Sequence, residues 1–207
     1  MRLTVMSHLT LDGVMQSNGK PEPELHDGFE QGGWQVPYLD EDLARLVADG
    51  IAAADAFLFG RGTYELFAGH WPFVTDPNDT IATRLNNMPK YVASTTLQRA
   101  EWNNSTLVHG DLVEQVTRLK QQPGNELQVH GSGTLIQTLM QHNLIDAYRL
   151  FIHPVVLGNG KRLFTTGTTP TALKLVDIKT TSRGVVVHAY EPSGTPEYGA
   201  VARGARV

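Results

Sequence analysis

The sequence predicts an α/β protein with a mostly parallel sheet covered by helices on both faces, and two observations carry this prediction. Apolar runs rich in β-branched residues alternate with amphipathic helical stretches over residues 3–142. Parallel strands need such crossovers, whose right-handedness places helices on both faces of the sheet. Beyond residue 147, three β-rich runs follow one another with no helical stretch between them. These runs indicate antiparallel strands at one side of the sheet.

Hydrophobic spacing justifies the elements in order along the chain. Residues 3–11 form an apolar, β-branched run typical of a strand. A loop containing Gly and Pro separates this run from a helix at 40–54, where Leu43, Leu46, Val47 and Ile51 repeat at helical spacing. The same criteria predict strands at 56–59, 90–94, 106–109, 126–130, 148–157, 173–178 and 185–190. Helices are expected at 63–68, 79–88 and 112–121, and residues 131–134 begin another helix that ends near residue 142.

Composition indicates one domain over residues 1–191 and a mobile tail at 192–207 that is rich in Gly, Ala, Arg and Pro. The 207 residues include no Cys, which excludes disulfides, thiolate zinc sites and a cysteine nucleophile. The 17 Lys and Arg against 21 Asp and Glu give no electrostatic reason to expect a nucleic-acid partner. The sequence has no signal-peptide core and no stretch of ~20 apolar residues. We therefore expect a cytoplasmic protein without a membrane partner.

Two glycine-containing junctions stand between an expected strand and an expected helix. Gly60-Arg61-Gly62-Thr63 follows the strand at 56–59, and Gly131-Ser132-Gly133-Thr134 follows the strand at 126–130. Such junctions present backbone N–H groups at the carboxyl edge of a parallel sheet, where α/β folds bind ligands. An Arg there can grip a phosphate, which favours NADPH over NADH. The alternative is that each junction is a tight turn with a helix cap or a solvating Arg.

Three further segments carry residues suited to ligand binding. Ser94-Thr95-Thr96 ends another strand with hydroxyls that fit a phosphate or ribose, or it forms a local hydroxyl turn. Trp34 and Tyr38, in the long loop over residues 16–39, provide an aromatic wall for a planar ligand or pack the loop itself. The turn that contains Lys161 and Arg162 is interpreted as solvated, although its cations suit a phosphate.

The eight His residues do not predict a metal site, because no pair has His-Glu-x-x-His or His-x-His spacing. Five of them lie on expected strands, where we interpret them as hydrogen-bonded, half-buried side chains. These five are His8, His109, His130, His153 and His188.

Taken in order, the motifs resemble the dihydrofolate reductase-like superfamily, in particular the group related to the reductase domain of riboflavin biosynthesis. The resemblance rests on Leu11-Asp12-Gly13, the two glycine junctions, and residues 89–97 and 144–164, and it covers about residues 1–190. It implies a three-layer fold with an eight-stranded, mostly parallel sheet and antiparallel C-terminal strands. It also implies NADPH bound across the carboxyl ends of the strands, and a homodimer.

The resemblance assigns cofactor contacts position by position. Arg61 is expected to meet the 2′-phosphate, and Gly60 and Thr63 to shape the helix start beneath the cofactor phosphates. The other expected contacts are Ser94, Thr95 and Thr96 with the adenosine phosphate or ribose; Gly131, Ser132, Gly133, Thr134 and Leu135 with the pyrophosphate; and Val14, Met15 and Gln16 over the nicotinamide.

The implied function is an NADPH-dependent reductase that transfers a hydride to a small planar heterocycle, of the 5-amino-6-(5-phosphoribosylamino)uracil reductase or pterin reductase type. Such a reaction also needs a proton, for which Asp12, Asp40 and Glu41 are candidate donors. Asp40 is equally an N-cap and Asp12 equally a turn residue, so no catalytic residue is assigned. Two alternatives stay open: a non-catalytic nucleotide- or pterin-binding protein on the same fold, and a true dihydrofolate reductase.

Overall fold

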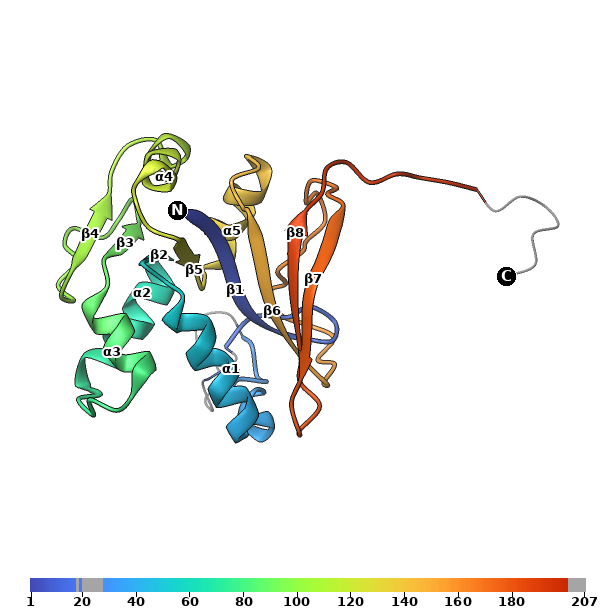
Figure 1. Cartoon of the computed structure of the whole chain (residues 1–207), viewed down its shortest axis with the longest axis horizontal. Coiled ribbons are helices and arrows are strands. Elements are labelled where there is room, and N and C mark those ends of the chain that lie inside the picture. Colours follow the sequence, from blue (N-terminus) through green and yellow to red (C-terminus); the bar gives the residue numbers. More distant parts are fainter. Residues whose placement is uncertain (18, 20–27, 201–207) are drawn as a thin grey trace.

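The computed structural model describes residues 1–17, 19 and 28–200, which form an eight-stranded sheet in the order β4-β3-β2-β5-β1-β6-β8-β7 (Figure 1). Neighbouring strands from β4 to β6 are parallel, whereas β8 is antiparallel to both β6 and β7. The predicted α/β class with antiparallel C-terminal strands is therefore confirmed. The strands are β1 Arg2–Thr10, β2 Ala56–Gly60, β3 Lys90–Ala93, β4 Ser105–Val108, β5 Glu126–Val129, β6 Ala147–His153, β7 Leu173–Thr180 and β8 Val186–Pro192.

Of the predicted boundaries that differ from the observed ones, two have identifiable reasons. The strand expected at 148–157 ends at His153, because Pro154 has no N–H to continue a ladder. The helix expected at 63–68 begins two residues earlier, at Arg61, with Gly60 as its N-cap. The helices are α1 Glu41–Ala52, α2 Arg61–Ala68, α3 Thr80–Asn87, α4 Leu112–Gln121 and α5 Gly133–Gln141, with short 3-10 helices η1 Val36–Tyr38 and η2 Trp71–Phe73.

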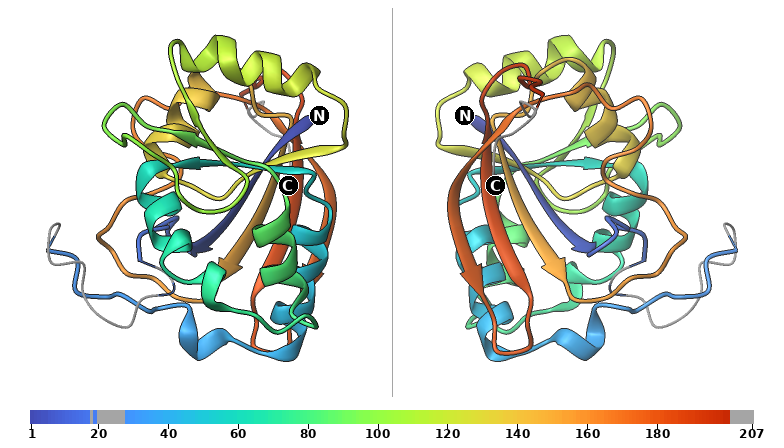
Figure 2. Two further views of the ribbon diagram at one scale, coloured as in Figure 1. Left: turned by 90° about the vertical axis from the view of Figure 1, so that its left-hand side faces the viewer. Right: turned by 90° about the vertical axis from the view of Figure 1, so that its right-hand side faces the viewer.

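The sheet divides the core into two layers, because successive side chains of a strand point to opposite faces. On one face, Leu58 of β2 packs in a cluster with Val116 of α4 and Ile136 of α5. On the other face, Phe57 and Phe59 of the same strand pack in a cluster that includes side chains from α1, α2 and α3. Figure 2 shows α4 and α1 on opposite sides of the sheet.

The helices differ in how their N-termini are satisfied. Asp40, Asp79 and Asp111 accept hydrogen bonds from backbone N–H groups at the starts of α1, α3 and α4. The N-caps of α2 and α5 are Gly60 and Ser132, and neither makes a side-chain cap. The first N–H groups of α2 and α5 therefore lack the side-chain acceptor that the other three helices have.

The chain after β8 leaves the sheet gradually. Ser193 and Gly194 still pair with Ala172 through backbone hydrogen bonds of 2.8 Å, and the chain then runs away from the domain towards residue 200 (Figure 1). Residues 201–207 of the expected tail, and 18 and 20–27 of the expected long loop, lie outside the described residues. Within the described ranges, no helix is both long and apolar enough to cross a membrane.

Candidate functional site

A pocket with a volume of about 700 Å³ lies at the carboxyl ends of β2, β3 and β4, against the start of α5. Most of the cofactor residues expected from the sequence line it: Gly60, Arg61, Ser94, Thr95, Thr96, Ser132, Thr134 and Leu135. The other lining residues were not expected as cofactor contacts: Gly62, Ala93, Leu97, Gln98, Val108, His109, Gly110, Leu112 and Thr138. Three separate strand ends therefore converge on one cavity.

The two glycine junctions contact each other beside this pocket. The Gly60 N–H donates to the Gly131 carbonyl at 3.0 Å. A Cβ at Gly60 would lie 2.8 Å from the Ser132 backbone nitrogen. Gly131 has a φ of 144°, and its Cβ would lie 2.6 Å from the Thr63 Oγ1. Thr63 and Gly131 do not line the cavity themselves, and the Gly60–Gly131 hydrogen bond joins its two helix starts.

Arg61 is oriented by two neighbours. Its Nη1 donates to the Thr96 Oγ1 at 2.9 Å, and its Nε lies 3.7 Å from the Glu65 Oε1. The Ser94 Oγ accepts hydrogen bonds from the Thr96 and Leu97 N–H groups at 3.2 and 2.9 Å. Ser94 thus forms a local hydroxyl turn, one of the two interpretations of this segment, and the turn places Thr96 within hydrogen-bond distance of the Arg61 guanidinium.

The charge of the pocket suits an anion. Among the described residues that line it none is acidic, and Arg61 and His109 are the two that can carry a positive charge. The uncapped starts of α2 and α5 add the positive ends of two helix dipoles. A larger neighbouring cavity, about 1030 Å³, contrasts with it, because Glu65, Asp76 and Glu101 are among its lining residues.

The interpretation of His109 as a half-buried strand residue was wrong. β4 ends at Val108, and the exposed His109 faces the pocket. Gly60 is in register with Ala93, and Ala93 with Val108, so the residues after these strands lie in one row. This row follows from the strand order, which the sequence pattern alone does not contain.

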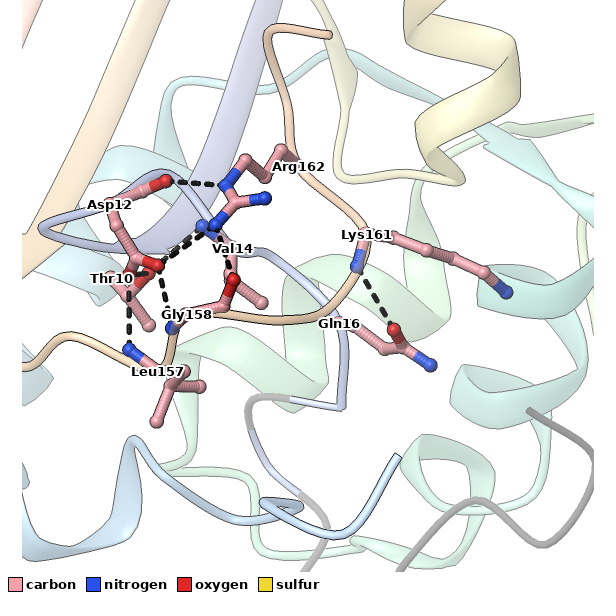
Figure 3. Close-up of polar contacts among 8 residues, drawn as sticks. All are labelled: Thr10, Asp12, Val14, Gln16, Leu157, Gly158, Lys161 and Arg162. Carbon is pink, nitrogen blue, oxygen red and sulfur yellow. Dashed lines mark hydrogen bonds and ion pairs between the residues drawn. The ribbon is translucent and has the colours of Figure 1, made fainter. Parts of the chain in front are cut away.

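The expected nicotinamide loop lies outside the cavity lining, beyond the second glycine junction. The Met15 Sδ would lie 3.4 Å from a Cβ at Gly133. The Met15 N–H donates to the Lys161 carbonyl at 2.9 Å, and the Lys161 N–H donates to the Gln16 Oε1 at 3.0 Å. Val14 is buried and forms an isolated bridge with Arg162. Residues 14–16 are therefore fixed to the turn at 158–162 (Figure 3).

The family of this fold is decided by comparison with known sequences. Residues 2–187 match the family model described as the RibD C-terminal domain. The chain belongs to this family. The Bacillus subtilis protein YyaP is 33% identical to it over 175 residues, which are 81% of this chain and 90% of YyaP. The resemblance seen in the sequence is thus confirmed at the level of the family.

Solved structures confirm the fold of this RibD C-terminal domain. A putative riboflavin biosynthesis protein from Shewanella sp. PV-4 matches with a TM-score of 0.65 and 20% identity, over 93% of this chain and 99% of that one. Dihydrofolate reductase from Enterococcus faecalis, complexed with NADP(H), matches with a TM-score of 0.57 and 13% identity, over 92% and 96%. The dihydrofolate reductase-like fold class is therefore confirmed.

In this RibD C-terminal domain, Asp12 is an anchor (Figure 3). Its carboxylate accepts hydrogen bonds from the Thr10 hydroxyl at 2.7 Å and from the N–H groups of Gly158 and Leu157 at 2.9 and 3.2 Å. The Arg162 Nη2 lies 3.1 Å from it. These donors, the Thr10 hydroxyl first, hold the pKa of Asp12 well below its usual range. An anion held in this way is suited to joining two loops and unsuited to donating a proton.

The other two carboxylates named as proton donors also lie outside the pocket lining. Asp40 is the N-cap of α1, and it also accepts hydrogen bonds from the Ser182 hydroxyl and the Arg183 N–H at 2.9 Å each. The Leu43 N–H is the main cause of the lowered pKa of Asp40. Glu41 is exposed at the first position of α1. The hydrogen bonds of Asp40 favour the N-cap interpretation.

Trp34 packs the long loop and also touches the sheet. It is 7% exposed, its Nε1 donates to the Gln16 carbonyl at 2.8 Å, and it clusters with Val14 and Phe29. Its ring lies edge-on to that of His153, with centroids 5.2 Å apart. Trp34 thus ties the loop to the sheet face that α1 covers.

Proposed function

We propose that this RibD C-terminal domain is an NADPH-dependent reductase of a small planar heterocycle, of the 5-amino-6-(5-phosphoribosylamino)uracil or pterin reductase type. The 700 Å³ pocket carries the proposal, because it combines two uncapped helix starts, Arg61 and a row of hydroxyls with no acidic lining among the described residues. A pyrophosphate needs N–H donors, and a 2′-phosphate needs a cation. Membership of the family supports the reductase class.

Each part of the site has a task in this proposal. Arg61 and Thr96 bind the 2′-phosphate, and residues 131–135 bind the pyrophosphate with their N–H groups. The loop at residues 14–16 covers the nicotinamide. Bound NADPH supplies the hydride, and the protein orients the two reactants. Because Asp12 and Asp40 already accept several hydrogen bonds, we infer that the proton comes from water or from the substrate.

Titration with NADPH and NADH tests the cofactor site, followed by Trp emission or by thermal stabilisation. We expect micromolar binding with NADPH preferred, and no binding of either cofactor would overturn the proposal. Oxidation of NADPH by a pterin, pyrimidinone or flavin then separates a reductase from a binding protein. Saturable binding without turnover of any of these would favour the non-catalytic alternative.

Replacement of Arg61 by alanine is expected to weaken NADPH binding about 10- to 100-fold and to leave NADH binding nearly unchanged. A charge-assisted pair with the 2′-phosphate is worth about 1.5–3 kcal/mol, and NADH lacks that phosphate. Arg45→Ala is the matched control, because Arg45 is an exposed helical Arg paired with Asp42 on α1. An equal loss of affinity for both cofactors would mean that Arg61 does not bind the 2′-phosphate.

We propose that the protein is a homodimer joined through β7. β7 is the last strand of the sheet, and Leu175, Val176 and Ile178 expose about half of their surface on it. An exposed apolar edge strand is a site of association unless it is covered. Light scattering that gives the mass of two chains would support the dimer, and a monomer mass at high protein concentration would exclude it.

A further inference from the structure

Two neighbouring histidine side chains lie on the sheet face that α1 covers. His8 is near the end of β1 and His153 is the last residue of β6, the neighbouring strand. Their ring centroids are 5.4 Å apart. The 700 Å³ pocket lies at β2, β3 and β4, whereas the two histidines lie on β1 and β6, on the other side of β5 and the second glycine junction. The proposed cofactor contacts use neither ring.

The hydrogen bonds of His153 fix its tautomer. Its Nδ1 lies 3.1 Å from the Phe151 carbonyl oxygen and 3.3 Å from the Leu9 carbonyl oxygen. Since both partners are acceptors, Nδ1 carries the hydrogen and Nε2 carries a bare lone pair. This Nε2 is buried without a hydrogen-bond partner among the described residues, on a side chain that is 0% exposed. It therefore calls for an N–H or O–H donor.

His8 completes the pair. Its ring stacks on that of Phe151, with centroids 4.5 Å apart, and its buried Nδ1 has no hydrogen-bond partner within the described part of the chain. Burial first, and then the nearby His153 and His130, lower the pKa of His8 to about 3, so the ring is neutral at pH 7. No described residue fixes which nitrogen carries the hydrogen, so the Nδ1 of His8 can act as donor or acceptor.

Two aromatic residues of the long loop pack against His153, the buried member of the pair. Trp34 and Tyr38 lie edge-on to His153, with centroid distances of 5.2 and 5.8 Å. No group of three or more His, Asp or Glu suited to a metal occurs in the described part of the chain. A planar ring held under aromatic side chains, with an N–H facing the bare nitrogen, satisfies the chemistry that the two imidazoles present.

We propose that His8 and His153 bind the N–H edge of the planar heterocycle, an inference that rests on the proposed reductase function. A neutral imidazole pair selects an uncharged ring with an N–H donor, whereas a carboxylate would favour a cationic one. His8 lies on β1, which pairs with β5 before the second glycine junction, and His153 lies on β6 at the other side of β1. Trp34 links His153 to the loop at residues 14–16, because its ring packs on His153 and its Nε1 donates to the Gln16 carbonyl. A substrate there is beside the proposed nicotinamide position, as hydride transfer requires.

Binding of lumazine and 1,3-dimethyllumazine to the unmodified protein is the first test. The two compounds differ in that methyl groups replace both N–H hydrogens of lumazine. Lumazine is expected to bind at least about tenfold more tightly. Leaving a buried acceptor without a donor weakens binding by about tenfold or more. Entry of the ligand displaces Trp34 and changes its fluorescence emission. This change should disappear in Trp34→Phe, while isothermal calorimetry still detects binding.

Variants of His8 give the second test. His8→Leu breaks no side-chain hydrogen bond among the described residues, and it should weaken lumazine binding about tenfold while leaving 1,3-dimethyllumazine binding unchanged. His8→Asn places an amide oxygen near the position of the Nδ1 and should restore most of the affinity. His188→Leu is the matched control, since His188 is another half-buried strand His, with Tyr190 as its partner, and it should change neither ligand.

The outcomes separate this inference from the proposed function. Equal binding of the two compounds, no binding of lumazine, or an equal loss for both in His8→Leu would overturn the role of the pair. NADPH is titrated into the same proteins. If NADPH binds and lumazine is not preferred, the inference alone fails. If lumazine is preferred and neither cofactor binds, the heterocycle site stands and the reductase proposal fails.

Discussion

Replacement of Lys90 by methionine is expected to lower the free energy of unfolding by about 3 kcal/mol. Lys90 is 0% exposed at the first position of β3. Its Nζ donates to the carbonyls of Leu85, Met88 and Asn86 at 2.7, 2.9 and 3.3 Å. Methionine fills the space of the stem but leaves these carbonyls without their donor, and each hydrogen bond to a charged group contributes about 1.5–3 kcal/mol.

The ammonium of Lys90 closes the end of α3, where the last carbonyls of a helix have no intrahelical partner. It also lies 4.5 Å from the centroid of the Trp102 ring, in a cation–π contact. Burial lowers the pKa of Lys90 to about 8, so the group is still mostly protonated at pH 7. The charge is therefore a structural part of the α3–β3 connection.

Chemical and thermal denaturation of Lys90→Met at pH 7 measure this effect. At about 2–4 °C per kcal/mol for a domain of this size, the Tm should fall by roughly 6–12 °C. Lys174→Met is the matched control, because Lys174 is an exposed lysine near the start of β7, and its stability should stay within about 0.5 kcal/mol of the unmodified protein. A change in the free energy of unfolding below about 1 kcal/mol in Lys90→Met would mean that water donates to the three carbonyls in place of the ammonium.

Hydrophobic spacing predicted the helices and strands because the spacing of each one lies within its own residues. Leu43, Leu46 and Ile51 recur at helical spacing, and α1 forms there. Two of the wrong boundaries occur where a single residue begins or ends an element in spite of the apolar pattern. Pro154 ends β6 although apolar residues continue after it, and Gly60 lets α2 begin at a charged residue before its apolar stripe.

The cofactor pocket could be predicted in part because each of its walls is a strand-to-helix or strand-to-turn junction visible in the sequence. The contacts between walls could not be predicted. The register of Ala93 with Val108 brings His109 to the pocket, and this register is a property of the folded sheet. Asp12 likewise meets Arg162 across 150 positions, a pairing that neither local segment encodes.

Substitution of Gly60 by alanine is expected to weaken NADPH binding about tenfold or more and to destabilise the fold by about 1–3 kcal/mol. The backbone of Gly60, with φ −75° and ψ 161°, suits alanine as well as glycine, so conformation is not the reason. The reason is space, because the new methyl would lie 2.8 Å from the Ser132 backbone nitrogen and overlap the Ser132 Oγ. Inserting a methyl into a filled contact costs about 1–3 kcal/mol.

Gly69→Ala is the matched control at the other end of α2. Gly69 has φ −79°, and its Cβ would meet the Glu65 carbonyl oxygen at an ordinary 3.4 Å. Calorimetric titration of both variants with NADPH separates local crowding from a general effect of alanine on this helix. In Gly60→Ala the start of α2 and the Ser132 turn must move apart, and both supply N–H groups to the proposed phosphate site. Normal NADPH affinity in Gly60→Ala would therefore mean that the two glycine junctions do not act as one site.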